Sequence, residues 1–437
     1  MLRKNIYKLN IVNILSYFLI LLPVLLISGP FLSDLSVSIL AITSFFYLKN
    51  KKFFNNYFFI IFMIFWALIL LSSFFSQDKV LSFKNSIFYF RFCLFSLFVW
   101  WILEYDNKIL KKIYFILLLC FFVIIFDSFF QYFNGVNILN MKIVNQDRVS
   151  SFFGEELKMG GFLMRLFPFL IALSLFFYKK KKHEKFLILA IIFIILVQFT
   201  IFLSGERSSF FLFNFTIILF LVFLNDFKNI KIFLFLVYSI SLVLILSIDT
   251  PFKERIINLT IKQTQINQLE KEKYIFSKQY HEHYLSSWKM FKDNILIGIG
   301  PKNFRVKCKD MKYNFSKLTC STHPHNFPLQ ILSETGIFSF LIYLILNIFV
   351  WYNLIKSVFA KILYKKNFLN NFQISLLINI AILIWPLASN GNFFNNWLSI
   401  LIYYPVGFLL WEFSNSKKMQ LKPFKKITFF QNILFYK

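Results

Sequence analysis

Long apolar segments separated by short polar ones dominate this sequence. A helix that crosses a hydrocarbon core of about 30 Å needs about 20 mostly apolar residues, and segments of this kind recur along the chain. The pattern predicts an all-α, polytopic integral membrane protein with about 12 transmembrane helices. We expect these helices near residues 9–29, 31–48, 57–75, 86–103, 113–133, 159–178, 186–203, 210–224, 232–248, 329–355, 370–388 and 397–413.

One polar segment interrupts the pattern. Residues 249–328 are rich in Lys, Glu, Gln and Asn, and they contain four of the five histidines. A chain that gathers its titratable groups in one loop is expected to do its chemistry there. The predicted organisation is residues 1–248 with helices 1–9, a large loop at 249–328 between helices 9 and 10, residues 329–413 with helices 10–12, and a basic tail at 414–437.

Composition and charge agree with a membrane protein. The chain is 58% hydrophobic, and its net charge of +28 would indicate a nucleic-acid partner in a soluble protein. Here, however, the basic residues cluster in alternate connecting segments, as the positive-inside rule requires of cytoplasmic loops. Both termini and the basic tail are therefore expected in the cytoplasm, and the large loop outside. The first apolar segment lacks a cleavage site and a second begins almost at once, so we expect an uncleaved first helix. A nucleic-acid role is disfavoured.

Arginine is rare and its placement is informative. Of the seven Arg in the chain, four lie in predicted outer segments: Arg148, Arg207, Arg255 and Arg305. Lys serves equally well as a topology signal, but only Arg offers a planar fork that binds phosphate in bidentate fashion. The placement therefore indicates an anionic ligand on the outer side.

Arg207 lies in a short outer turn just before a predicted helix. Free backbone N–H groups of that helix would help to hold an anion beside its guanidinium. The alternative is an interfacial Arg paired with Glu206 or with lipid headgroups. Arg148 precedes another helix, which carries Arg165 within the membrane, where charged residues are usually functional. For both, function and structural ion pairing remain open, with Glu155 or Glu156 as the candidate partner of Arg165.

The histidine-rich end of the loop supplies a candidate base. His325 is followed by Asn326 and Pro328, which places it at the N-terminus of the tenth helix. The positive end of the helix dipole favours a neutral imidazole, which can accept a proton from a hydroxyl. The alternative is that His325 only caps the helix or binds headgroups. His323 and Glu334 are expected to support and orient the contacting groups, and Gly336 to allow close helix packing.

Further upstream, His281 and His283 precede Trp288 on a segment with helical periodicity, expected to lie along the outer leaflet. Cys308 and Cys320 both lie in the loop, and an oxidising exterior would permit a disulfide between them. A metal site is disfavoured because the His and Cys spacing does not match known ligand patterns, and no cofactor is expected.

Two motifs make the chain resemble a known family. His325-Asn326 is followed by nine residues and then Gly336, with Ser339 three positions later. Arg207 is followed by Phe211, where the motif has Leu, and then by Leu212. In these features, and in a large loop between helices 9 and 10, the sequence resembles the O-antigen ligase/O-antigen polymerase superfamily of bacterial membrane glycosyltransferases over roughly residues 140–345.

One family feature is missing. The family carries an Arg shortly before the loop Trp, whereas here only His281 and His283 precede Trp288. Either a histidine substitutes for that Arg, or Arg255 or Arg305 folds back toward the site.

The resemblance implies a metal-independent, inverting glycosyltransferase in the bacterial inner membrane, surrounded by membrane lipids, with its active site facing the periplasm. Arg207, with Arg148 or with His281 or His283, would hold the pyrophosphate of an undecaprenyl-pyrophosphate-linked glycan, and His325 would act as general base. A ligase would use lipid A-core as acceptor, and this reading is favoured. A polymerase would use another lipid-linked glycan, and transfer to a protein hydroxyl is a third alternative.

Outside enzymes, the alternative is a lipid-glycan flippase or other transporter. Transporters often show internal repeats and charged residues deep in several helices. This sequence shows no convincing repeat, and its ionisable groups gather at one face, so the transporter reading is disfavoured.

Overall fold

The structure is a computed structural model that describes residues 2–178, 183–225, 227–264, 274 and 277–419. The elements are α-helices with short 3-10 and π segments, and the described residues contain two isolated bridges but no β-strand. The predicted all-α class is confirmed. The basic cluster at 179–182 and most of the predicted tail, residues 420–437, lie outside the described residues.

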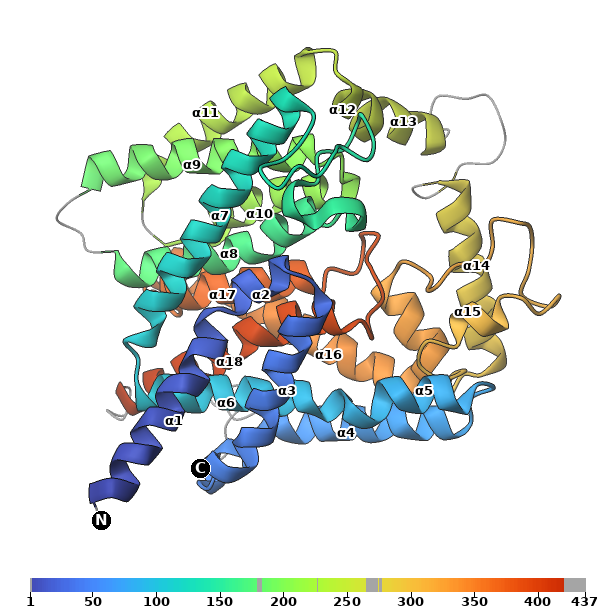
Figure 1. Ribbon diagram of the computed structural model, residues 1–437, viewed down its shortest axis with the longest axis horizontal. Coiled ribbons are helices and arrows are strands. Elements are labelled where there is room, and N and C mark those ends of the chain that lie inside the picture. The colour runs from blue at the N-terminus through green and yellow to red at the C-terminus, as the bar shows by residue number, and fades with distance from the viewer. Residues whose placement is uncertain (1, 179–182, 226, 265–273, 275–276, 420–437) are drawn as a thin grey trace.

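The helices follow the predicted order along the chain (Figure 1). The elements before the polar segment are α1 (Leu2–Ile20), α2 (Leu22–Ile27), α3 (Pro30–Tyr47), η1 (Lys51–Phe53), α4 (Tyr57–Phe74), α5 (Lys79–Ser86), η2 (Ile87–Phe90), α6 (Arg91–Tyr105), α7 (Ile109–Asn134), η3 (Ser151–Glu156), α8 (Met159–Phe177), α9 (His183–Leu203), α10 (Arg207–Phe223) and α11 (Lys228–Ser247). Those after it are α16 (Phe327–Tyr364), α17 (Asn371–Leu383) and α18 (Asn396–Met419).

Each of the twelve predicted segments contains a helix, but the helices differ in their capacity to span a membrane. Among the described residues, eight helices are long and apolar enough to do so. The other four apolar stretches are shorter: Ile11–Ile20, Ile188–Leu203, Arg207–Phe223 and Asn371–Leu383. The structure therefore supports a multi-pass membrane protein, and the number twelve stays a prediction.

Proline explains two departures from the predicted boundaries. The helix expected at 9–29 is split at Leu21, because Pro23 in the first turn of α2 has no N–H to continue the helix before it. The helix expected at 370–388 ends at Leu383 as α17, since Pro386 disfavours helical backbone in the residue before it.

Helix α6 packs against α3 and α18. Apart from Arg91, Trp101, Glu104 and Tyr105, its residues are buried. Arg91 at its start forms an ion pair with Asp34 of α3 at 2.5 Å, and Asn396 of α18 donates to the same carboxylate at 3.2 Å. The sequence pattern offers no partner for Arg91, and the structure shows that this charge joins three helices.

The polar segment folds into short helices at one end of the bundle (Figure 1). They are α12 (Pro251–Lys253), η4 (Glu254–Asn258), α13 (Leu259–Thr264), α14 (Lys278–Asp293) and α15 (Phe304–Lys307). Helix α14 is the amphipathic helix predicted around Trp288, and it packs on α16. Of the residues predicted to share the face toward the outer leaflet, Leu285 and Trp288 are exposed, whereas Phe291 is buried.

Candidate functional site

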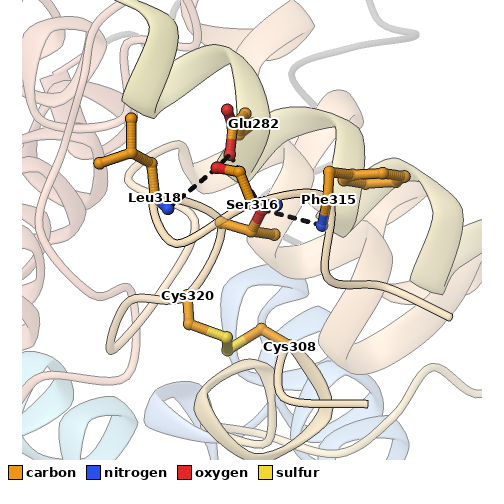
Figure 2. Close-up of a disulfide and its surroundings, with 7 residues drawn as sticks. Glu282, Cys308, Phe315, Ser316, Leu318 and Cys320 are labelled. Atoms are coloured by element: carbon orange, nitrogen blue, oxygen red, sulfur yellow. Dashed lines mark hydrogen bonds between the residues drawn. A yellow bond between two sulfur atoms is a disulfide. The ribbon is translucent and has the colours of Figure 1, made fainter. Parts of the chain in front are cut away.

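The segment Ser321–Asn326 is fixed at both of its ends. Upstream, Cys308 and Cys320 form a disulfide, shown in Figure 2. In the same loop the Ser316 hydroxyl donates to the carboxylate of Glu282 on α14. Downstream, Asn326 caps α16 by accepting a hydrogen bond from Leu329 N at 3.1 Å. The histidines between these anchors are thus held against α14 and the start of α16.

Two hydrogen bonds with the connection between α17 and α18 also hold the segment Ser321–Asn326. The Asn326 amide donates to the Pro386 carbonyl at 2.9 Å, and Asn390 N donates to the His325 carbonyl at 2.9 Å. His325 has a positive φ of 57°, an uncommon conformation that persists only where surrounding contacts hold it. The connection between α17 and α18 therefore fixes the backbone of His325.

Two histidine rings and one tyrosine ring gather around His325. The ring of His323 lies 4.0 Å away between centroids, and that of His283 lies 5.4 Å away in a nearly parallel arrangement. Tyr280, one turn before His283 on α14, presents its ring edge-on at 5.2 Å. Burial and, to a smaller extent, the neighbouring His283 together lower the pKa of His325 to about 4. The imidazole is therefore neutral at neutral pH.

The two neighbouring histidines are not equivalent to His325. His323 Nε2 lies 3.3 Å from the Asn390 carbonyl, and its Nδ1 lies 2.9 Å from the Thr322 hydroxyl. Because a carbonyl only accepts, Nε2 carries the proton and both ring nitrogens are engaged. Burial lowers the pKa of His323 to about 3. His283 is fully buried behind His325. His325 Nε2 lies 3.1 Å from the Ser321 hydroxyl.

His325 lines a cavity of about 810 Å³ whose walls also contain arginines, and we call it the arginine cavity. Its cationic residues are Arg148, Arg165, Arg207 and Arg255. They come from the loop before α8, from α8, from the start of α10 and from η4. The structure thus brings together the predicted pair Arg148 and Arg207 with His325.

Gly205 lets two of these arginines approach each other. Its φ is +62°, and a Cβ there would lie 2.9 Å from Arg255 Cδ and 3.0 Å from Arg148 Cγ. Arg255 donates to the Gly205 carbonyl at 3.0 Å and pairs with Asp147 at 2.9 Å. Of the two arginines expected to fold back toward the site, Arg255 lines this cavity. Arg305 lies elsewhere.

The cavity carries uncompensated positive charge. Arg207 donates to the neutral Gln263 at 2.7 Å, and Arg148 to the Leu157 carbonyl at 3.1 Å. Within the described part of the chain, neither forms an ion pair with a carboxylate. Burial lowers the pKa of Arg148; the charge of Glu206 opposes this shift, and that of Arg255 adds to it. Such an array of fork-shaped donors suits a phosphate ligand.

Glu206 turns away from Arg207. Its carboxylate accepts from Gly160 N at 2.8 Å and from Ser209 Oγ at 2.9 Å, so the alternative pairing of Glu206 with Arg207 is not found. Burial raises the pKa of Glu206. It is also the carboxylate that acts electrostatically on Arg165. Glu156, one of the two predicted partners of Arg165, instead pairs with Lys158 at 2.5 Å.

A smaller cavity of about 370 Å³ adjoins the first. Its basic residues include Lys158, Lys302 and Arg305, and we call it the lysine cavity. Both cavities share the wall residues Arg165, Glu206, His323 and Gly391. Neither of the two predicted donor-binding histidines lies in a cavity wall: the ring of His281 is 5.5 Å from that of Tyr274, and His283 is buried against the ring of His325. Tyr280 lines the arginine cavity and was not singled out from the sequence.

Glu334 and Gly336 of α16 both contact the loop segment 295–304. Glu334 is buried in α16 and accepts from Phe304 N at 3.2 Å and from Gln330 Nε2 at 2.9 Å. Gly336 has φ +78°, and a Cβ there would lie 2.2 Å from the Leu296 carbonyl oxygen. Both residues dock the segment 295–304 onto α16. Across the described residues, no group of three His, Cys, Asp or Glu side chains is placed to hold a metal ion.

A comparison with protein families finds a match over part of the chain. Residues 189–344 match the family model described as O-antigen ligase. The matched range runs from α9 into α16 and includes Arg207, Arg255 and His325. A search among curated proteins found no match. The family match confirms the resemblance to the O-antigen ligase/polymerase superfamily that the motifs indicated.

Proposed function

We infer that this protein is a glycosyltransferase that moves a glycan from undecaprenyl pyrophosphate to a hydroxyl of lipid A-core. Its sequence resembles the O-antigen ligase/polymerase superfamily. One observation carries this proposal. His325 and three arginines from separate segments, Arg148, Arg207 and Arg255, line a single cavity. A neutral base beside a phosphate-binding array is what transfer from a pyrophosphate-linked sugar requires.

The arginines serve the leaving group. In the proposed reaction the acceptor oxygen forms a bond to the anomeric carbon while the bond from that carbon to the pyrophosphate oxygen breaks. The electron pair leaves with undecaprenyl pyrophosphate, so negative charge develops on that oxygen. Guanidinium groups that are already in place stabilise this charge most strongly in the transition state. The positive charge comes from the protein, so the proposed mechanism is metal-independent.

His325 accepts the proton of the acceptor hydroxyl. Attack from the side opposite the leaving group gives inversion at the sugar carbon. The alternative role of helix cap is filled by Asn326, which accepts from Leu329 N. The lowered pKa of His325 keeps the ring in its basic form. His323 and His283 position the ring, since each packs against it.

Apolar residues on one side of the arginine cavity suit a polyprenyl chain. Phe211 from α10 and Leu242 and Leu246 from α11 line that side. Phe211 is 54% exposed, and only 11% of the apolar span in α11 is buried. We propose that the lipid donor enters laterally along α10 and α11. Phe211 then meets the lipid at the position where the family motif has Leu.

Topology follows from the same proposal. The polar segment 249–328 would face the periplasm of a bacterial inner membrane, where oxidising conditions maintain the Cys308–Cys320 disulfide. Residues 1–248 and 329–413 would supply the membrane helices, and residues 414–437 a cytoplasmic tail. Donor and acceptor would both approach from the outer leaflet.

Transfer by purified protein tests the proposal. The protein in detergent is given undecaprenyl-pyrophosphate glycan, a chelator and either lipid A-core or a second donor molecule. We expect product on lipid A-core, abolished by His325→Ala and reduced at least tenfold in kcat/KM by Arg207→Lys, which keeps the charge and loses the fork. Lys262→Gln changes an exposed cation of α13 and serves as the matched control.

The outcomes separate the alternatives. A lengthened donor in place of modified lipid A-core would identify a polymerase. Absence of transfer to either acceptor, together with transport of the lipid-linked glycan across a bilayer, would identify a transporter. Full activity of Arg207→Lys would rule out bidentate binding of the pyrophosphate by that residue.

A further inference from the structure

The lysine cavity has no part in the transfer step derived above. It lies across His323 from the arginine cavity, with which it shares four wall residues. Its volume of about 370 Å³ falls in the range of small-molecule sites, about 300–1,000 Å³. A group bound there would lie beside the His323 ring, which packs against His325.

The polar atoms left unpaired in this cavity are donors. Arg305 Nε and Asn392 Nδ2 are buried and have no hydrogen-bond partner within the described residues. Asn392 is 8% exposed, and its Oδ1 already accepts from Gln330 Nε2 at 3.0 Å and from Phe394 N at 2.8 Å. Buried donors without acceptors are rare in folded proteins. A ligand that brings acceptor oxygens satisfies both donors once the two side chains turn toward the cavity.

Positive charges outnumber negative ones in the wall of this cavity, where Lys158, Arg165, Lys302 and Arg305 face one carboxylate. Within the described chain, neither Lys302 nor Arg305 forms an ion pair with a carboxylate. Glu334 lies near Arg305, but its two oxygens accept from Phe304 N and Gln330 Nε2. The one carboxylate in the wall, Glu206, is occupied by Gly160 N and Ser209 Oγ. The cavity therefore favours an anion.

A hydrogen bond and a disulfide of nearby residues hold Arg305 in place. It lies on α15, a single turn of helix. Phe304 before it is buried and hydrogen-bonded to Glu334, and Cys308 after it forms the disulfide with Cys320 (Figure 2). The same disulfide lies five residues before His325. One crosslink thus connects the segment bearing Arg305 to the segment bearing the proposed base.

We propose that the lysine cavity binds an anionic substituent, a phosphate or a carboxylate, of the acceptor glycan. Arg305 and Lys302 pair with its oxygens, Asn392 donates to it, and the acceptor hydroxyl is thereby placed beside His325. The enzyme then selects acceptors by a charged group next to the reacting sugar. This inference rests on the proposed function, since it specifies the acceptor of that reaction.

Acceptor kinetics test the assignment. KM is measured for lipid A-core, for the same acceptor after phosphatase treatment and for a form with its carboxyl groups amidated. Arg305→Gln and Lys302→Gln are expected to raise KM for native acceptor roughly tenfold or more, the size of losing one hydrogen bond to a charged group. For the acceptor form that lacks the recognised group, both variants should match wild type. Lys309→Gln, an exposed cation in the same loop, should change neither KM.

A rise in KM for native acceptor, without a rise for the form that lacks the recognised group, excludes a merely structural effect. A general disturbance of the loop would raise KM for every acceptor form, or lower kcat, and either result overturns the proposal. Unchanged KM for native acceptor in both variants also overturns it. Donor KM serves as an internal reference, because the arginine cavity is left intact.

A binding measurement separates failure of this site from failure of the proposed function. Thermal unfolding of the protein in phosphatidylcholine nanodiscs is followed during titration with glucose 6-phosphate and, as reference, glucose. Stabilisation by glucose 6-phosphate should persist in Arg207→Lys and disappear in Arg305→Gln. If this holds while no transfer is found, the anion site stands and the glycosyltransferase proposal fails.

Two results would overturn the anion site or its assignment. Equal thermal stabilisation by glucose 6-phosphate and by glucose would show that the cavity does not bind the anion. Loss of the stabilisation in Arg207→Lys alone would show the same. Arg305-dependent stabilisation by phosphatidylglycerol nanodiscs without any sugar would assign the cavity to a lipid headgroup, which contradicts an acceptor role.

Discussion

Replacing Gly336 by Ala tests how the loop is docked on α16. Gly336 has φ +78° and ψ −178°, a backbone region that only glycine occupies readily. An added Cβ would lie 2.2 Å from Leu296 O and 2.8 Å from Ile297 N. These are backbone atoms, so no side-chain rotation relieves the overlap. The contact can be relieved only if the segment 295–300 moves away from α16.

The magnitude follows from two contributions. The unfavourable backbone conformation costs about 1–3 kcal/mol, and overpacking adds typically about 1–3 kcal/mol. Gly135 is a matched control, because its φ is +74° but a Cβ there would meet nothing within 4 Å. Gly135→Ala should therefore cost only about 1 kcal/mol, the usual penalty for a left-handed residue. We expect Gly336→Ala to destabilise by about 2–6 kcal/mol.

Equilibrium unfolding in mixed micelles, followed by tryptophan fluorescence, measures both variants against wild type. Gly336→Ala should also raise the acceptor KM, because the displaced segment leads directly to Lys302 and Arg305, whereas Gly135→Ala should not. Equal losses of stability in the two variants would refute the reasoning, since they would show that the close approach to Leu296 carries no cost.

Three further predictions concern the site. The pKa of His325 is lowered to about 4, so the ring stays neutral in mildly acidic solution. We therefore expect kcat/KM for transfer to stay constant from neutral pH down to about 5 and to fall only below that. A decrease in kcat/KM centred on the ordinary imidazole pKa of about 6.5 would contradict this. Arg255→Lys should raise donor KM roughly tenfold and leave acceptor KM unchanged, because Arg255 lies in the arginine cavity alone, and a larger effect on acceptor KM would place it elsewhere. Cys308→Ser should lower the free energy of unfolding by about 3 kcal/mol under oxidising conditions and leave that of the reduced protein nearly unchanged. If the substitution lowers the free energy of unfolding equally in reductant, packing and not the crosslink is responsible.

The helices and the candidate base follow from local sequence signals. Apolar length predicted the helices, and the single polar interval predicted where ionisable groups gather. Rare arginines among abundant lysines singled out Arg207 and Arg148, and the proline and asparagine after His325 placed it at the start of a helix. Each of these signals involves residues within a few turns of one another, so the chain itself contains them.

Which side chains converge was decided by the packing of the helices. The sequence left Arg255 and Arg305 as equal candidates, and tertiary contacts place Arg255 beside Gly205 and Arg305 in the neighbouring cavity. Glu206, adjacent to Arg207 in sequence, turns instead to the start of α8. Tyr280 reaches His325 only because α14 packs on α16.

The physical reason lies in the near-uniform apolarity of these helices. In a soluble protein an apolar stripe shows which helix face is buried, but in a membrane the lipid-facing and packed faces are both apolar. Helix pairing then depends on close approach at residues such as Gly407 of α18 against α6, and on partly buried polar contacts such as Arg91 with Asp34. Such contacts join residues far apart in the chain. The sequence alone therefore determined the elements and the chemistry available, and the tertiary structure decided which of those groups share a cavity.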